Sequence, residues 1–302
     1  MEKTVSKKNL QPQISIIVVS YNTSDIIAMC LESLLAESSI TREIFVVDNA
    51  STDGSAEFIK TNFPSVNGIF NEKNVGFAVA NNQALPLCRG KYVLFLNPDA
   101  SLNPCAIENM IAYMNDNPQI GLAGGNISYP DGEPQWTVSD RYPGQKYASD
   151  ELEQLPGSIA CVIGAAMIIR SELVKVTGGF DEDFFLYGED QDLCLRIRKA
   201  GYEIGYADAA TIIHRGGSSV KSLSPSGIWE KKIIAEYIFY RKHYRPETIR
   251  KISRAYVIKC RWRIATLKIL YPFTWNKETA MDKIRKYQVI LRHVTRTIRS
   301  EQ

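Results

Sequence analysis

The sequence has 302 residues, of which 45% are hydrophobic and 23% are charged. This composition is typical of a folded globular protein and excludes a disordered or fibrous chain. The longest apolar run, 159–169, is too short to span a bilayer, and the polar tail 1–12 lacks the apolar core of a signal peptide. We therefore expect a cytoplasmic protein, whose six cysteines without a CxxC pair indicate reduced, buried thiols.

The net charge of +3 is distributed unevenly along the chain. Residues 1–214 carry 15 Lys and Arg against 27 Asp and Glu, whereas residues 215–302 carry 21 against 6. Such asymmetry indicates a basic appendage on an acidic body. We therefore predict a catalytic domain over 13–220, preceded by the polar tail, and a basic helical extension over 221–302.

Strands and helices alternate through the first part of the chain. Runs of β-branched residues predict strands over 14–20, 44–48 and 92–96, with a short strand over 67–70. Apolar residues at helical spacing predict helices over 24–35, 55–62 and 74–89. This alternation predicts an α/β fold with a Rossmann-like, mostly parallel sheet flanked by helices.

The rest of the predicted domain continues this alternation. The same signals predict helices over 107–114 and 187–200 and strands over 121–125, 159–169 and 203–206. A polar stretch with several aromatic residues, 129–150, shows little secondary-structure signal. We interpret this stretch as a candidate acceptor-binding or lid segment, because binding residues are often carried on loops.

Polar residues follow the predicted parallel strands. Asp48 ends the second strand and Asp99 follows the strand over 92–96, at the sheet edge where open α/β sheets bind ligands. Ser51 or Thr52 is expected to cap the next helix. The first strand is followed by neither GxGxxG nor GKS or GKT, which argues against a dinucleotide-binding dehydrogenase and a P-loop enzyme. The Asn- and Asp-rich turns instead suggest recognition of a base, a ribose and a metal-bound diphosphate.

Six motifs in a fixed order carry a resemblance to a known family. They are SYNT (20–23), VVDNASTDGS (46–55), NVGFAVANN (74–82), LNPDA (96–100), GGFDEDFFLYGEDQDLCLR (178–196) and IIHRGGSS (212–219). With these motifs the chain resembles the family-2 glycosyltransferases with the GT-A fold. It is most similar to the bacterial rhamnosyltransferase-like branch that builds surface polysaccharides.

The resemblance implies a binding site for a nucleotide-sugar donor. Tyr21, Asn22 and Asp48 would hold the base and ribose, with the Asp48 carboxylate accepting from a pyrimidine N–H. The same motifs extend the donor-binding set to Ser20, Asn49, Asn74, Gly76, Phe77, Asn81, Asn97 and Asp99. Structural alternatives are that Tyr21 is a turn aromatic and that Asn74 caps a helix.

The resemblance also implies a metal ion. Asp99 matches the last acid of the family's DxD motif, in which Asn97 and Pro98 replace the first two positions. A departing diphosphate requires Mg²⁺ or Mn²⁺ to neutralise its charge. His214 stands where the family places a further metal ligand, and the Gly/Ser segment 216–219 would close over the diphosphate with Arg215. The alternatives are helix capping by Asp99 and a structural role for His214.

The catalytic base is expected in an acidic cluster at the start of a helix. The helix macrodipole favours Glu189, Asp190 and Asp192 at this position, and the resemblance places the base among them. Asp190 shares a helix face with Cys194 and is expected to point inward, where desolvation raises its pKa. Asp192 is expected to form a surface ion pair with Arg196, and Glu189 to support the site or the metal.

Together these residues predict an inverting, metal-dependent glycosyltransferase. It would transfer a sugar onto a hydroxyl of a growing surface polysaccharide or a lipid-linked glycan. The donor that we predict is dTDP-L-rhamnose, which supplies L-rhamnose. The alternatives are a UDP-sugar donor, a nucleotidyltransferase and a non-catalytic sugar-binding module. A nucleotidyltransferase is expected to carry a phosphate-binding loop after its first strand, which is absent here. A non-catalytic module has no need of Asp99, Glu189, Asp190 and His214.

The basic extension contains a helix with an apolar arc. Residues on this arc are Ile249, Ile252, Tyr256, Cys260, Leu267 and Leu270, and those opposite are Arg250, Arg254, Arg261 and Lys268. Such a helix could lie on an anionic membrane, where lipid-linked acceptors reside. A helix that covers the protein core or forms an oligomer is the alternative. No nucleic-acid-binding module is recognised, so we expect no nucleic-acid partner.

Overall fold

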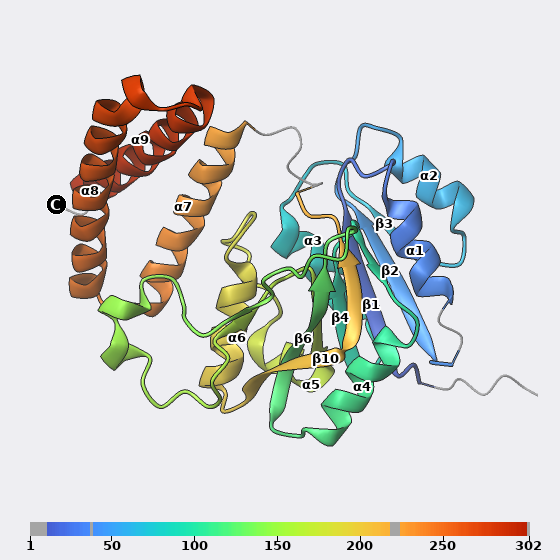
Figure 1. The fold of residues 1–302 in the computed structure, drawn as a ribbon. Helices are drawn as coiled ribbons and strands as arrows, with labels where there is room; N and C mark the ends of the chain where they lie inside the picture. Colours follow the sequence, from blue (N-terminus) through green and yellow to red (C-terminus); the bar gives the residue numbers. More distant parts are fainter. Residues whose placement is uncertain (1–10, 37–38, 218–223, 301–302) are drawn as a thin grey trace, which may run out of the picture. The chain divides into compact units, whose positions relative to one another are not determined.

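The computed structural model describes residues 11–36, 39–217 and 224–300, which form two compact units (Figure 1). The first, the sheet unit, comprises the described parts of 1–140, 156–182 and 189–219. The second, the helical unit, comprises 141–155, 183–188 and the described part of 220–302. Two segments from within the predicted domain 13–220 therefore pack with the C-terminal helices.

The sheet unit is built on eight paired strands. These are β1 (Ile14–Ser20), β2 (Arg42–Asp48), β3 (Asn67–Phe70), β4 (Tyr92–Leu96), β5 (Ala100–Leu102), β6 (Ile120–Ser128), β9 (Ala166–Arg170) and β10 (Glu203–His214). Their order in the sheet is β3–β2–β1–β4–β9–β6–β10–β5. The first four run parallel, and β6 is parallel to β10. β9 is antiparallel to both its neighbours, and β5 is antiparallel to β10.

Helices cover both faces of this sheet (Figure 1). They are α1 (Ile27–Ala36), α2 (Ser55–Asn62), α3 (Phe77–Ala84), α4 (Ala106–Asp116), α5 (Ser171–Thr177) and α6 (Glu189–Lys199). On one face, Leu31 of α1 and Met110 of α4 belong to a single buried apolar cluster with the strands. On the other, Leu173 of α5 and Ile197 of α6 approach so closely that a Cβ at Gly121 would lie within 2.8 Å of each. These layers confirm the predicted α/β fold.

The structure differs from the predicted elements in three places. The predicted strand 159–169 is interrupted: β8 (Cys161–Val162) pairs with β7 (Val138–Ser139), and only β9 joins the main sheet. The strand β5 directly after Asp99 was not predicted. The predicted caps of α2, Ser51 and Thr52, are also wrong, because the helix follows Gly54 at φ 90° and has no side-chain cap.

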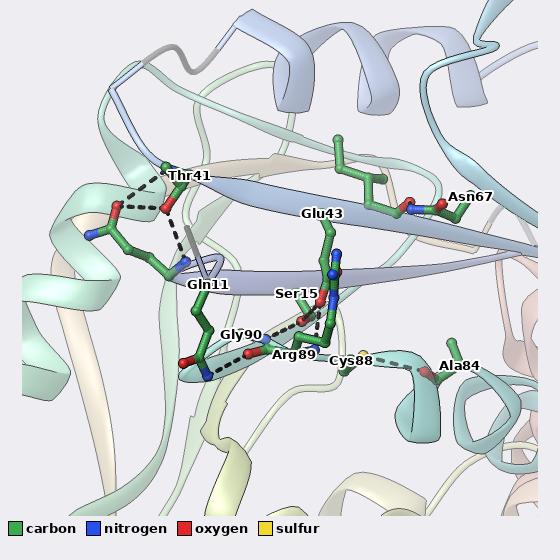
Figure 2. A network of polar contacts seen from close by, with 11 residues as sticks. Gln11, Ser15, Thr41, Glu43, Asn67, Ala84, Cys88, Arg89 and Gly90 are labelled. Atoms are coloured by element: carbon green, nitrogen blue, oxygen red, sulfur yellow. Dashed lines mark hydrogen bonds and ion pairs between the residues drawn. The ribbon is translucent and has the colours of Figure 1, made fainter. Parts of the chain in front are cut away.

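A polar network fastens the ends of β1 and β2 that lie away from the predicted site (Figure 2). The Glu43 carboxylate accepts hydrogen bonds from the Ser15 hydroxyl at 2.6 Å and from the Arg89 backbone N–H at 2.6 Å. The Arg89 guanidinium donates to the other Glu43 oxygen at 2.9 Å. A Cβ at Gly90 would lie 2.4 Å from the Ser15 nitrogen, so only glycine permits this close approach of the chain.

The helical unit contains three long helices and the two short segments. The helices are α7 (Pro225–His243), α8 (Pro246–Leu270) and α9 (Lys277–Ser300), of which α8 and α9 pack along each other. The Tyr237 hydroxyl and the Ser253 hydroxyl, 2.7 Å apart, join α7 to α8. Tyr142 from the first segment stacks on Phe239, with ring centroids 5.8 Å apart. No described helix is both long enough and apolar enough to cross a bilayer.

The predicted apolar arc of α8 is buried inside the helical unit in its first part. Ile249, Ile252 and Cys260 are all buried there. The alternative of a helix that covers a core describes these three residues, whereas Leu270, the last residue of the arc, is exposed. The expectation of buried thiols holds for Cys260 and three others but not for Cys88, which is half-buried, or for Cys105, which is exposed beside the start of α4.

Candidate active site

The parallel strands bring the predicted site residues to one edge of the sheet. Ser20 and Asp48, the last residues of β1 and β2, are in register, and β4 ends beside them at Leu96. Because these strands run in the same direction, the segments that follow them leave the sheet together. This edge carries every donor-binding motif that lies before residue 100.

Asp48 is buried, and its two carboxylate oxygens have different surroundings. Oδ2 accepts a hydrogen bond from the Ser51 N–H at 2.9 Å, whereas Oδ1 is buried and has no hydrogen-bond partner within the described part of the chain. An unpaired buried acceptor is unfavourable unless a ligand satisfies it. Oδ1 is therefore available to an N–H donor, as the predicted contact with a pyrimidine requires.

Asn22 fastens the turn after β1 to the turn after β2. Its side-chain oxygen accepts from the Thr52 N–H at 2.8 Å, and its own N–H donates to the Ser51 hydroxyl at 2.9 Å. The side chain of Tyr21 is half-buried, and its hydroxyl forms no hydrogen bond to any described residue. The turn therefore does not depend on the Tyr21 hydroxyl, which leaves that group to a ligand.

Asn49 and Asn74 order the loop before α3. The Asn49 amide donates to the Asn74 side-chain oxygen at 3.0 Å, and Asn49 Oδ1 accepts from the Val75 N–H at 3.0 Å. Asn74 also accepts from the N–H of Gly76, whose φ of 89° favours glycine. Asn74 does not cap α3, because the helix begins after Gly76 and has no side-chain cap.

Two predicted donor contacts are not supported by the side-chain positions. Ser20 is fully buried, and its hydroxyl lies 2.7 Å from that of Thr23. Asn81 is also buried and donates to the Phe77 carbonyl at 2.9 Å. Both side chains therefore stabilise the local structure from within. Phe77, at the start of α3, packs edge-on against Phe180 with ring centroids 5.7 Å apart.

Asp99 and His214 meet because β5 pairs with β10. The register places Ala100 of β5 opposite His214 at the end of β10. Asp99 Oδ1 consequently lies 3.2 Å from His214 Nε2, and Asn97 Nδ2 lies 3.4 Å from the same nitrogen. Both Asp99 and His214 are buried. Asp99 precedes a strand, so the alternative of a helix cap is excluded.

Gln135 holds the His214 imidazole in one orientation. Its amide nitrogen donates to the His214 backbone carbonyl, and its oxygen lies 3.0 Å from His214 Nδ1. A backbone carbonyl can only accept, so the amide orientation is fixed and Nδ1 must carry the proton that Gln135 accepts. In the neutral imidazole Nε2 then has a lone pair directed at Asp99, and a cation between the two acceptors would be favourable.

This donor set fits part of a metal site. A carboxylate oxygen and an imidazole nitrogen are ligands for a divalent cation, and Mg²⁺ and Mn²⁺ accept further oxygens from phosphate groups. No group of three or more His, Cys, Asp or Glu side chains within residues 11–36, 39–217 and 224–300 is arranged to hold a metal. The donor diphosphate and water would therefore have to complete the coordination.

The break between β8 and β9 contacts both Asn97, beside the proposed metal ligands, and Asp190, the predicted base. The Gly164 N–H donates to Asp190 Oδ2 at 3.1 Å, and the carbonyl of the next residue, Ala165, accepts from the Asn97 N–H at 2.9 Å. One dipeptide thus touches both α6 and the end of β4. A continuous strand could not do so, because its backbone groups would be paired with neighbouring strands.

Glu189 and Asp190 form a close acidic pair at the start of α6. Burial raises the pKa of Glu189 above its ordinary value, and the neighbouring Asp190 carboxylate raises it further. Burial also raises the pKa of Asp190, although hydrogen bonds from Gln191 and Gly164 oppose it. Asp190 remains half-buried whereas Glu189 is buried, and Glu189 Oε2 has no hydrogen-bond partner among the described residues. Of the two, Asp190 is the better placed to reach a substrate.

The predicted ion pair of Asp192 exists but is not on the surface. Arg196 Nε lies 2.7 Å from Asp192 Oδ2, and Asp192 is fully buried. The same guanidinium donates to the carbonyls of Thr177 and Gly179 at 2.7 and 2.9 Å. Asp192 therefore has a structural role, which ties α6 to the turn after α5.

Sequence reasoning missed three residues that organise this site. Asn82 accepts from the Phe180 N–H at 3.0 Å and donates to its carbonyl at 2.8 Å, which fixes the turn before α6. The others, Gln135 and Gly164, act through contacts between distant segments that no local pattern records.

The predicted closing segment begins at Arg215, which is exposed and whose backbone N–H donates to the Asp99 carbonyl at 3.1 Å. The serines of the predicted closing segment, 218 and 219, lie outside the described residues.

The same fold is found in solved structures. The chain resembles a mannosyltransferase, PcManGT from Pyrobaculum calidifontis in complex with GDP-Man and Mn²⁺, with a TM-score of 0.57 and 19% identity over 81% of this chain and 68% of that one. It also resembles S. aureus TarS 1-349 in complex with UDP, with a TM-score of 0.52 and 16% identity over 96% and 92%. Identities this low establish the fold alone, which is that of the GT-A glycosyltransferases.

The family follows from the sequence comparison. The family described as Glycosyl transferase family 2 matches residues 15–178, more than half of the chain, so the protein belongs to glycosyltransferase family 2. It is 26% identical over 226 residues to the N-acetylglucosaminyl-diphospho-decaprenol L-rhamnosyltransferase of Mycobacterium tuberculosis, covering 63% of this chain and 73% of that one. It is also 31% identical over 130 residues to the putative teichuronic acid biosynthesis glycosyltransferase TuaG of Bacillus subtilis, covering 42% and 52%. The predicted family and enzyme class are confirmed.

Proposed function

We propose that this glycosyltransferase is inverting and metal-dependent and transfers L-rhamnose from dTDP-L-rhamnose to a hydroxyl of a lipid-linked glycan in surface polysaccharide biosynthesis. The observation that carries the proposal is the single sheet edge that holds a free Asp48 oxygen, the Asp99–His214 pair and Asp190. The Asp48 oxygen would accept from a pyrimidine N–H, the Asp99–His214 pair would bind the metal of the diphosphate, and Asp190 would accept the proton of the acceptor hydroxyl. The mycobacterial rhamnosyltransferase supports the choice of donor.

In the proposed reaction, Asp190 is the general base. Its carboxylate removes the proton of the acceptor hydroxyl as that oxygen attacks the anomeric carbon of the donor sugar. The bond from this carbon to the diphosphate oxygen breaks on the opposite face, so the configuration inverts. The proton stays on Asp190, and the nucleoside diphosphate leaves with the bonding electrons. The Gly164 N–H holds the Asp190 carboxylate in place during this step.

Asp99 and His214 would hold the Mg²⁺ or Mn²⁺ ion. When bound, this ion neutralises the negative charge that develops on the departing diphosphate. Asn97, within 3.4 Å of His214 Nε2, would contact the donor or a metal-bound water. The buried setting strengthens these electrostatic interactions, because the local dielectric constant is lower than that of water.

A donor panel tests this proposal. The purified chain is incubated with a lipid-linked glycan acceptor, Mn²⁺ and either dTDP-L-rhamnose or UDP-hexoses, and the released nucleotide is measured. We expect release from dTDP-L-rhamnose, with Asp99→Ala inactive although folded. Transfer from a UDP-hexose and none from dTDP-L-rhamnose contradicts the donor assignment. Activity of Asp99→Ala in a chelator contradicts the metal assignment.

A further inference from the structure

Large apolar side chains are exposed along the second half of α8 and in the turn that follows it. They are Ile258, Trp262, Ile269 and Leu270 of α8 with Phe273 and Trp275 of the turn that follows, and we call them the docking surface. Phe273 is 87% exposed, and Trp275 is exposed completely. Such a patch marks an interaction site, because folded chains normally bury aromatic residues of this size.

The helix α8 thus carries two apolar faces. Ile252 and Cys260 are buried on the inner face, where the helical unit accounts for them. Ile258, Trp262 and Ile269 recur after four and seven residues, which places them on one outer stripe. Nothing within the described helical unit covers this stripe, since its members are 60–69% exposed.

Basic residues border the apolar stripe. Arg254, Arg261 and Lys268 recur every seven residues, one position before the stripe, and all three are exposed. None of them forms an ion pair with another described residue. The one acidic residue in the sequence of α8, Glu247, lies at its far end and pairs with Arg250 at 2.8 Å. The docking surface therefore combines apolar groups with unneutralised positive charge.

We propose that the docking surface binds the headgroup region of an anionic lipid bilayer. Tryptophan and phenylalanine side chains insert at the membrane–water boundary, while arginine and lysine attract anionic headgroups. A second copy of the chain is a poorer occupant, because a symmetric contact would bring the basic borders against each other. Membrane binding stands apart from the proposed sugar transfer; only its purpose, access to a lipid-linked acceptor, rests on that function.

The charge contribution is tested with vesicles. Full-length protein is sedimented with vesicles of phosphatidylcholine alone or with about one-third phosphatidylglycerol. Binding is expected only to the anionic vesicles and to weaken with salt. The variant Arg254→Gln/Arg261→Gln/Lys268→Gln should bind on the order of 100-fold more weakly. The matched control, Lys283→Gln/Arg292→Gln/Arg299→Gln on α9, removes the same charge and should lose less than about 10-fold.

The apolar contribution is tested with a second pair of variants. Trp262→Ser/Phe273→Ser/Trp275→Ser should lose at least about 10-fold in vesicle binding, because it removes the inserting aromatic groups. Its control is Trp136→Ser/Leu87→Ser, which changes two exposed residues of the sheet unit and should bind normally. Circular dichroism checks that each variant folds. Truncation before α8 is unsuitable, because it would uncover the buried Tyr237.

Two results overturn the proposal. If the α9 control loses as much binding as the α8 variant, the attraction to the vesicles comes from the net charge of the protein and not from the docking surface. If wild type sediments with neither kind of vesicle but forms a dimer that the aromatic variant abolishes, the surface binds a second copy instead.

Discussion

Asp190 and Glu189 are neighbours in sequence, but within the described part of the chain only Asp190 accepts a hydrogen bond from a backbone N–H of another segment. We predict that Asp190→Asn transfers sugar at least about 100-fold more slowly than wild type, since it removes the general base. Donor binding and metal binding should remain normal, because Asp190 contacts neither in the proposed site. Single-turnover rates and a donor titration by thermal shift separate the two effects.

The control for this prediction is Asp192→Asn. It breaks a buried ion pair and should therefore destabilise the fold by about 3–5 kcal/mol while the folded protein keeps most of its activity. If Asp192→Asn is inactive and Asp190→Asn is active, the base has been assigned to the wrong acid.

Glu189 should make stability fall as pH rises. Its pKa is higher in the folded state than in the unfolded chain, so between the two values the folded state binds more protons. The associated stability is complete below the unfolded pKa and is lost as pH approaches the folded pKa. Glu189→Gln should therefore be more stable than wild type at pH 9 by at least about 1 kcal/mol. Urea unfolding at pH 5 and pH 9 measures this difference, and Glu72→Gln, an exposed carboxyl, should show none.

Gln135 should control metal affinity without touching the metal. Replacing it with methionine removes the acceptor that keeps the proton on His214 Nδ1. The proton can then move to Nε2, and Nε2 no longer keeps a lone pair for the metal. We expect Mn²⁺ to bind about 10–100-fold more weakly to Gln135→Met in the presence of donor nucleotide. Isothermal titration measures this affinity. Gln135→Glu, which retains an acceptor for the Nδ1 proton, should keep more of it than Gln135→Met, and equal losses would contradict the tautomer argument.

At the scale of secondary-structure elements, Glu43 secures the start of β2 to β1 and to the chain before β4 (Figure 2). Burial alone would raise the pKa of Glu43, but hydrogen bonds from Ser15 and Arg89 outweigh it and lower the pKa. This carboxylate therefore stabilises the fold above the unfolded pKa, and the contribution is lost as pH falls through the folded pKa.

Glu43→Gln should consequently lower the free energy of unfolding by about 1.5–3 kcal/mol at pH 7, the usual range for hydrogen bonds to a charged group. The difference from wild type should shrink on acidification, once the Glu43 carboxylate is protonated. Denaturant unfolding at pH 7 and pH 3 checks both statements. The rate of sugar transfer should not change, because Glu43 lies at the other end of β2 from Asp48. A constant difference at both pH values would contradict the assignment.

Two elements could not be predicted from local sequence. β5 has three residues, too few for a pattern, and it exists because it pairs with β10. The run 159–169 is apolar throughout, as a buried strand would be, yet it breaks where Gly164 and Ala165 bond to α6 and to Asn97. Both outcomes depend on partners distant in the sequence, so the secondary-structure propensity of the local residues cannot predict them.

At the scale of the whole molecule, the fold was predictable because strong local signals repeat. The buried runs of β1 and β4 and the alternation with helices define the sheet, and the strand ends define the site edge. The exact use of each side chain was not predictable. Ser20 and Asn81 stand in the donor motifs yet point into the protein, whereas Gln135 lies in a stretch without any pattern and holds His214.

The outermost strands of the sheet, β3 with four residues and β5 with three, are also its shortest. An open sheet ends in unpaired backbone groups, and long edges of this kind recruit other chains into fibrils. Edges this short offer little to extend, so concentrated protein should not convert to amyloid. We expect no thioflavin T signal after prolonged incubation. Any self-association should instead keep the native amide I infrared spectrum.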